Sequence, residues 1–374
     1  MSERGNPLFR ADHVGSLLRP AAVAEARASV LGPGELSSPA LKPVEDTAIA
    51  EAVAMQEDVG LRLATDGEYR RSFWHYDFMD GLTGVNIVEH PERSGLQFSG
   101  PQLRPFFPEI TGRIDFPDDH PMLDHFRHLA SVSNVTPKIS IPGPSACHFR
   151  TAAADIAPSE YDDVEVLLSD VSAAYAKAVQ AFYDAGCRYL QLDDIFFAYL
   201  CDDTQRDRKR AEGFDPDQLI TAYADTLERS IADRPDDMTI AMHMCRGNFR
   251  STWVASGGYD PAVDAIFNRT SVDVYLMEYD TDRAGGLEPL ALLPKGPKRV
   301  MPGFISTKTR PLESSDELRR RFDQASRFVD MDQLGIAPQC GFASTEEGNE
   351  ITAADQRAKL ELVVATATDL WGGV

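Results

Sequence analysis

The chain alternates short apolar runs with longer stretches of helical periodicity, and this alternation restricts its fold more than any other feature. Eight apolar runs, several of which end in polar or glycine residues, span residues 12–20, 63–71, 138–145, 189–197, 239–247, 272–280, 299–307 and 334–342. Between them, Ala, Val and Leu recur at helical spacing over residues 46–60, 161–186, 216–233, 313–329 and 351–371. Strands that alternate with helices predict a parallel sheet. Eight such units predict an α/β fold, the (β/α)8 or TIM barrel.

One segment interrupts the alternation. Residues 85–130 are rich in Pro, His, Phe and Gly. We predict an insertion after the second strand, either a small hairpin or a lid, with a disordered loop as the alternative. The whole chain, residues 1–374, is then expected to form a single barrel domain that carries this insertion.

Two cysteines, a histidine and a glutamate follow three of the predicted strands. His243 and Cys245 lie in AMHMCRGNF, Glu278 in VDVYLMEYD and Cys340 in APQCGFAST. The carboxyl ends of barrel strands meet at the face where such barrels carry their active sites. Two sulfur ligands favour zinc over magnesium or calcium, so the four residues predict a zinc site. The alternative is structural, because a free Cys is most often a small buried hydrophobe.

Charge and apolar patterning exclude several classes of partner. The chain has 37 Lys and Arg against 59 Asp and Glu, a net charge of −22. Nucleic acids and anionic membrane surfaces attract basic proteins, so neither is an expected partner. The sequence has no apolar run near the ~18 residues of a membrane span, no apolar signal core and no disulfide-like cysteine pattern. We expect a cytoplasmic protein that binds small molecules; its oligomeric state is not indicated.

Six motifs resemble the catalytic barrel of the cobalamin-independent methionine synthases. HVGSLLRP, DGEYRR, LQLDD, HMCRGN, MEYD and PQCGFAST occur in the family's order and extend over nearly the whole chain. The resemblance implies that His243, Cys245, Glu278 and Cys340 are zinc ligands. The chain is most similar in kind to the short, core-only bacterial members, which consist of the catalytic barrel without the N-terminal barrel of the full-length enzymes.

The resemblance also implies a reaction and its substrate contacts. The family transfers a methyl group to the thiol of homocysteine, which gives methionine. Glu68 in DGEYRR and Asp193 in LQLDD match the carboxylates that bind the homocysteine ammonium. Ser16 in HVGSLL matches the loop that binds the substrate carboxylate. The structural alternatives are that Asp193 or Asp194 caps a following helix and that Glu68 pairs with Arg70 or Arg71.

Two departures from the family pattern leave the methyl donor open between methyltetrahydrofolate and another methyl carrier. The family has a folate-stacking Trp where this chain reads IPGPSACHF, so His148 or Phe149 would replace it. Lys308, in GFISTKTRP, lies nearest the family's proton-donating His. It is a candidate catalytic acid or anion-binding group, with a solvated loop charge as the alternative. A polyglutamylated folate would require a basic patch. The candidates for that patch are Arg70, Arg71, Arg246 and Lys308.

Three functions are compatible with these residues. The first is a zinc-dependent methyltransferase that acts on homocysteine. The second is alkyl transfer between another thiol and an electrophile, as in epoxide:coenzyme M transferase, whose sulfonate-bearing acceptor requires a cationic pocket. The third is a zinc-stabilised binding protein without turnover. Glu68 and Asp193 favour an amine, and so homocysteine, whereas Arg70 and Arg71 keep the second function open.

Overall fold

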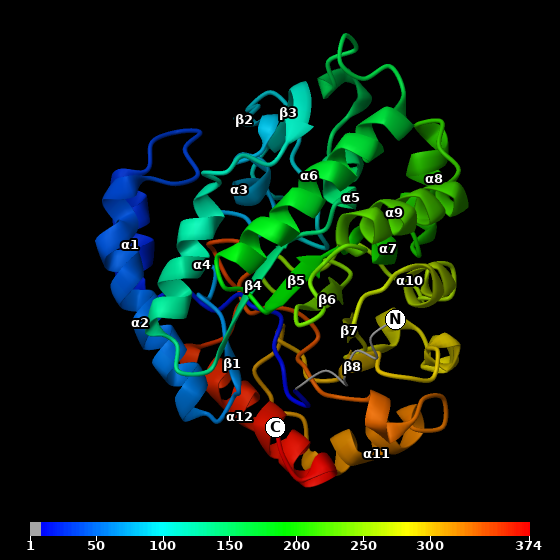
Figure 1. Cartoon of the computed structure of the whole chain (residues 1–374). Helices are drawn as coiled ribbons and strands as arrows, with labels where there is room; N and C mark the ends of the chain where they lie inside the picture. The colour runs from blue at the N-terminus through cyan, green and yellow to red at the C-terminus, as the bar shows by residue number, and fades with distance from the viewer. Residues whose placement is uncertain (1–8) are drawn as a thin grey trace.

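A parallel sheet that curls into a barrel lies at the centre of the computed structural model, which describes residues 9–374 (Figure 1). Its strands neighbour one another in chain order: β1 (Leu63–Ala64), β4 (Thr136–Pro142), β5 (Tyr189–Asp193), β6 (Thr239–Met244), β7 (Val274–Glu278) and β8 (Arg299–Gly303). The parallel register aligns their carboxyl ends, so Asp193 lies opposite His243 and Glu278 lies opposite Gly303. The polar residues that end these strands therefore share one face of the barrel.

Two irregular segments complete the ring: residues 11–16, the first closing segment, and residues 334–341, the second closing segment. Single parallel bridges join Ala11 to Ile336, Val300 to Leu334 and Ile305 to Pro338. At the other edge, Thr65 Oγ1 donates to the carbonyl of Gly15 at 2.6 Å. The expected α/β barrel is confirmed, but its first and last strands are bridges rather than regular ladders. Pro338 contributes to this irregularity because proline has no N–H for a ladder hydrogen bond.

Helices surround the strands, with α1, α2 and α4 on one side and α9 and α10 on the other (Figure 1). They are α1 (Ala21–Val30), α2 (Lys42–Asp58), α3 (Tyr76–Met79), α4 (Pro121–Val132), α5 (Ser145–Phe149), α6 (Val164–Asp184), α7 (Phe196–Tyr199), α8 (Asp203–Ala211), α9 (Pro216–Ile231), α10 (Val263–Arg269), α11 (Ser315–Ala325) and α12 (Ala353–Trp371). Short 3-10 turns cover η1 (Pro39–Leu41), η2 (Ala153–Asp155), η3 (Asp282–Ala284), η4 (Glu288–Leu292) and η5 (Met331–Gln333). Between residues 9 and 374, no helix has the length and apolar character needed to cross a membrane.

The segment expected to be an insertion contains two different structures. An antiparallel hairpin, β2 (Thr83–Glu89) and β3 (Phe106–Asp115), forms a separate sheet, and β3 packs against α6. By contrast, α4 packs against α2 and β4, where the helix after the second barrel strand belongs. The element added to the barrel is thus the hairpin with its loop, residues 90–105.

A buried ion pair connects the first closing segment to the sheet. Lys138 Nζ lies 2.7 Å from Asp12 Oδ1, and both side chains are fully buried. The Tyr189 hydroxyl donates to the other Asp12 oxygen at 2.6 Å, and Lys138 also donates to the carbonyl of His13 at 2.7 Å. Since each charged atom has a partner, the pair fixes the segment against β4 and β5 without leaving an unpaired charge in the barrel.

We expect the Asp12→Ala variant to lose about 3–5 kcal/mol of unfolding free energy, because the ammonium of Lys138 would remain buried without its carboxylate. Urea unfolding followed by circular dichroism measures the loss. Asp332→Ala is the matched control, since that side chain is 92% exposed and lies 3.7 Å from Arg10. Equal losses in the two variants would contradict a structural role for the buried pair.

Candidate metal centre

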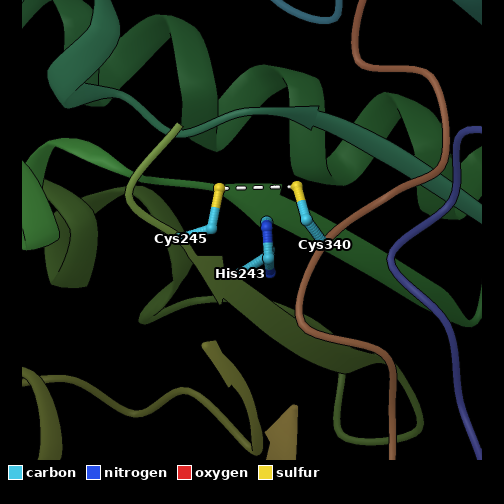
Figure 2. Close-up of side chains that lie close together, drawn as sticks. All are labelled: His243, Cys245 and Cys340. Carbon is cyan, nitrogen blue, oxygen red and sulfur yellow. Dashed lines mark hydrogen bonds between the residues drawn. The ribbon is translucent and has the colours of Figure 1, made fainter. Parts of the chain in front are cut away.

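Three of the four predicted ligands lie together at the carboxyl face of the barrel (Figure 2). His243 is on β6, Cys245 follows that strand, and Cys340 lies on the second closing segment. Their ligand atoms all lie within 4.8 Å of one another, and all three residues are buried. The two sulfur atoms are 3.5 Å apart. Tetrahedral zinc with bonds of about 2.3 Å places two sulfur ligands about 3.8 Å apart, so the arrangement fits zinc.

The histidine is oriented for ligation by its Nε2 atom. Nδ1 of His243 lies 3.2 Å from the carbonyl oxygen of Leu276 on β7. A carbonyl only accepts hydrogen bonds, so Nδ1 carries the proton and Nε2 keeps its lone pair. Nε2 is buried without a hydrogen-bond partner in the described chain. Metal-ligating histidines commonly donate their other N–H to a carbonyl in this way, which supports the fit to a metal.

The two thiols have opposite pKa shifts. Burial opposes ionisation of Cys340, but the hydrogen bond with Cys245 and the proximity of His243 hold the pKa of Cys340 well below its usual value. The hydrogen bond with Cys340, together with burial, raises the pKa of Cys245 well above its usual value. The pair therefore favours one thiolate next to one thiol. The thiolate is the form that binds a metal.

The fourth predicted ligand, Glu278, is buried at the end of β7 but lies outside this group. One carboxylate oxygen accepts from the backbone N–H of Arg246 at 2.7 Å. The other oxygen pairs with the guanidinium of Arg283. Burial opposes ionisation, yet Lys308 and these arginines lower the pKa of Glu278. The carboxylate is thus ionised and engaged by other groups.

The three predicted substrate residues line the same cavity as the thiols. This inner cavity is bounded by Ser16, Glu68, Asp193, His243, Cys245 and Cys340, together with apolar and aromatic side chains described below. The second closing segment packs against Ser16 at Gly341, where a Cβ atom would lie 1.9 Å from the Ser16 hydroxyl oxygen. A side chain after Cys340 would displace the Ser16 hydroxyl, so glycine at this position of the C-G motif allows the close approach.

The two carboxylates in the inner cavity are both buried and incompletely paired. Glu68 accepts from the Ser140 hydroxyl at 3.0 Å, while its Oε2 atom has no partner in the described chain. Asp193 accepts from Gln191 at 2.6 Å. Burial raises the pKa of Glu68 and raises that of Asp193 to about 7, to which the negative charge of Glu68 also contributes. A bound cation would relieve this repulsion.

The backbone and neighbours of these carboxylates test the two alternatives to substrate binding, which are an ion pair for Glu68 and a helix cap for Asp193. Glu68 has a φ of 60°, a strained conformation of a kind that clusters at functional sites. Arg71 lies 3.9 Å from its Oε1 atom, at the limit of an ion pair. Helix α7, which follows Asp193, has no side-chain cap at its N-terminus. The capping alternative for Asp193 is therefore wrong.

The expected basic patch does not form. Arg70 pairs with Glu45 at 3.0 Å. Arg71 and Arg246 donate to backbone carbonyls, those of Ser140 and Gly257 among them. Lys308 is buried, and its Nζ has no hydrogen-bond partner in the described chain. The positive charge of Lys308 favours ionisation of Cys245 and Glu278, although Lys308 does not line the inner cavity.

Several residues of the inner cavity are not among the predicted site residues. They are Trp74, His75, Leu96, Phe98, Leu103, Arg150 and Tyr199, among others. Trp74 supplies an aromatic wall, although it follows the second strand rather than the third. Its position three residues after the DGEYRR motif is the one signal that the sequence offers. His148, a proposed replacement for the folate-stacking Trp, does not line the cavity; it bonds Tyr223 at 2.7 Å.

Residues 9–368 match the family described as cobalamin-independent synthase, catalytic domain. The chain belongs to this family. It is 45% identical over 364 residues to YxjH, an uncharacterized protein of Bacillus subtilis, with 97% of this chain and 95% of that protein covered. A crystal structure of a putative vitamin-B12-independent methionine synthase from Listeria monocytogenes is 35% identical, with a TM-score of 0.76 over 99% of this chain and 100% of that one.

A more distant structure has the same fold. It is the B12-independent methionine synthase from Shewanella sp. W3-18-1 in complex with selenomethionine, with a TM-score of 0.69, 19% identity and coverage of 97% and 98% of the two chains. The 5-methyltetrahydropteroyltriglutamate–homocysteine methyltransferase of Bacillus licheniformis is 23% identical over 303 residues, which are 80% of this chain and 36% of that protein. Family membership supports a methyltransferase role.

We expect Cys340→Ser to weaken zinc binding at least tenfold, because a hydroxyl rarely replaces a thiolate on zinc. Zinc content after dialysis against a chelator of known affinity, measured by elemental analysis, tests this. Cys187→Ser is the control, since Cys187 is buried outside the inner cavity. Undiminished zinc in Cys340→Ser, with the control equally loaded, would contradict the three-residue centre.

Proposed function

We propose that this protein is a zinc-dependent S-methyltransferase that moves a methyl group to the thiol of homocysteine and forms methionine in the cytoplasm. One observation carries the proposal: one cavity is lined both by the three candidate metal ligands, two of which are thiols, and by the buried, incompletely paired carboxylates of Glu68 and Asp193. A substrate with a thiol at one end and an ammonium at the other matches both halves of this cavity. Homocysteine is such a molecule.

His243, Cys245 and Cys340 would hold the zinc ion. Bound zinc would supply the acceptor thiol in its thiolate form at neutral pH, where a free thiol is only slightly ionised. Three protein ligands leave a fourth position for the substrate, the arrangement typical of catalytic rather than structural zinc. Glu278 would reach the metal only by giving up its contacts with Arg246 and Arg283.

Glu68 and Asp193 would bind the substrate ammonium. The unpartnered Oε2 atom of Glu68 supplies one acceptor, and the carboxylate of Asp193 supplies another. Charge-assisted hydrogen bonds of this kind are the stronger ones in proteins. Ser16 lines the same cavity and would bind the substrate carboxylate through its hydroxyl and backbone N–H.

Lys308 would act on the methyl donor. Its buried ammonium has no hydrogen-bond partner in the described chain and does not line the inner cavity, so it would give its proton to the group that leaves the methyl carbon only after its side chain turned towards that cavity. The donor itself is methyltetrahydrofolate or another methyl carrier.

A second function is favoured by one residue of the cavity. Arg150 places a guanidinium at the inner cavity, and that cation would suit a thiol that carries a sulfonate. Such an acceptor would fit zinc-dependent alkyl transfer of the epoxide:coenzyme M transferase kind. Glu68 and Asp193 argue against it, because a sulfonate-bearing thiol has no ammonium for them to bind.

Calorimetric titration of the zinc-loaded protein with L-homocysteine tests the acceptor. In two buffers of different ionisation enthalpy, we expect binding with release of about one proton, because the thiol loses its proton as it binds zinc. The metal-free protein should not show this release. Absence of binding to the zinc-loaded protein would reject homocysteine and favour a different thiol.

We expect Glu68→Gln to weaken homocysteine binding about ten- to a hundredfold, the effect of losing a hydrogen bond to a charged group. Zinc content should stay unchanged, because Glu68 is not part of the metal group. Glu25→Gln is the control, since Glu25 is exposed on α1. Unaltered homocysteine affinity in Glu68→Gln would reject the ammonium contact.

A further inference from the structure

A second cavity adjoins the inner one on the side of the hairpin loop. This outer cavity is formed by the loop between β2 and β3, by residues 149 and 150 after β4, and by the start of α8. Four residues line both cavities: Leu96, Leu103, Arg150 and Tyr199. A ligand that reaches the thiols through the outer cavity therefore passes Arg150.

The outer cavity is locally cationic in an acidic chain. Arg104, Arg150 and Arg208 line it, and its described lining contains no Asp or Glu, although the chain carries a net charge of −22. Arg104 and Arg208 have carboxylate partners outside the cavity, Glu346 at 2.7 Å and Glu212 at 3.0 Å. Arg150 differs from both, because within residues 9–374 it forms no salt bridge.

The partner of Arg150 is a neutral histidine. The Nε and Nη2 atoms of Arg150 donate to Nε2 of His75 at 3.2 and 3.0 Å. Burial and the adjacent guanidinium lower the pKa of His75 well below its usual value, so the imidazole accepts these bonds without a charge of its own. The positive charge of Arg150 thus remains uncompensated at the junction of the two cavities.

Aromatic rings fix the position of this charge. The ring of Trp74 stacks on His75 with centroids 4.4 Å apart, and His75 stacks on Tyr76 at 3.8 Å. The guanidinium of Arg150 lies 5.5 Å from the Tyr76 centroid. A guanidinium that is held in place loses little entropy when it binds a carboxylate or phosphate. Trp74 provides a flat apolar wall beside it in the inner cavity.

We propose that Arg150, supported by Arg104 and Arg208, is an anion subsite that binds the carboxylate or phosphate of the methyl donor in the outer cavity. The inference rests on the proposed methyl transfer, because it assigns the outer cavity to the donor. The donor is then an anion whose methyl-bearing part lies against Trp74 in the inner cavity. Carboxylates and phosphates share the geometry that a guanidinium recognises.

Calorimetry on the zinc-loaded protein tests the subsite with three probes. They are p-aminobenzoyl-L-glutamate, which joins a flat ring to two carboxylates, inorganic phosphate, and the neutral p-aminobenzamide. We expect an anionic probe to bind, and Arg150→Gln to weaken it about tenfold or more, the loss typical of a charge-assisted contact. Arg208→Gln, at an exposed position, should weaken it less. Arg250→Gln is the matched control, because Arg250 is half exposed and lines neither cavity.

The outcomes separate the chemical sources. Arg150-dependent binding of p-aminobenzoyl-L-glutamate supports a carboxylate-bearing donor, and Arg150-dependent binding of phosphate alone supports a phosphate-bearing one. Equal affinity of wild type and Arg150→Gln for the anions, or no anion binding by the folded wild type, overturns the subsite. Equal loss in Arg208→Gln and Arg250→Gln would remove Arg208 from it.

A parallel titration separates this inference from the proposed function. If L-homocysteine fails to bind while anion binding still depends on Arg150, the subsite stands and the homocysteine acceptor is rejected. If 2-mercaptoethanesulfonate binds through Arg150 and homocysteine does not, the anion belongs to the acceptor, and the assignment to the donor is overturned. Circular dichroism of each variant excludes unfolding as the cause of lost binding.

Discussion

Closure of the barrel by residues 334–341 is the constraint on which the metal centre depends. This segment carries Cys340 but has only single bridges to its neighbours, so individual hydrogen bonds fix its place. The backbone N–H of Gln339 donates to Ile305 at 2.9 Å, and the carbonyl of Gly341 accepts from Thr307 at 3.0 Å and Asn248 at 2.8 Å. Asn248 belongs to the loop that also carries Cys245. The same contacts that close the barrel therefore bring the two thiols together.

The site keeps several polar atoms that no described protein group satisfies. Nε2 of His243, Oε2 of Glu68 and Nζ of Lys308 are all buried without hydrogen-bond partners in the described chain. Each such atom costs about 1–3 kcal/mol in a folded protein. Folded proteins retain such unsatisfied atoms at functional sites, where a ligand supplies the missing hydrogen-bond or coordination partner. A metal, an ammonium and a departing anion would satisfy the three atoms in turn.

Strand ends could be predicted from the sequence because parallel pairing aligns them. The register that places Asp193 opposite His243 follows from the order of the apolar runs. It brings a predicted substrate-binding carboxylate and a predicted metal ligand to the same face of the barrel. Glu278 shows the limit of this reasoning. Its position at the end of β7 was predictable, but the direction of its carboxylate depends on Arg246, on a loop, and on Arg283, in the short η3 turn, and neither segment has a periodic pattern.

The part of the site proposed to bind the methyl donor was the least predictable from the sequence, because its residues also lie outside periodic elements. Trp74 and Arg150 lie in irregular chain after β1 and α5, and they meet only because His75 stacks on one and accepts from the other. Leu96 and Leu103 come from the hairpin loop, an element that the barrel does not need for its own closure. The barrel thus positions the thiols and the acceptor carboxylates, while the added hairpin forms part of the wall through which a donor must pass. Members of this family that keep the barrel but differ in the hairpin would therefore keep the thiol chemistry and differ in the donor they admit.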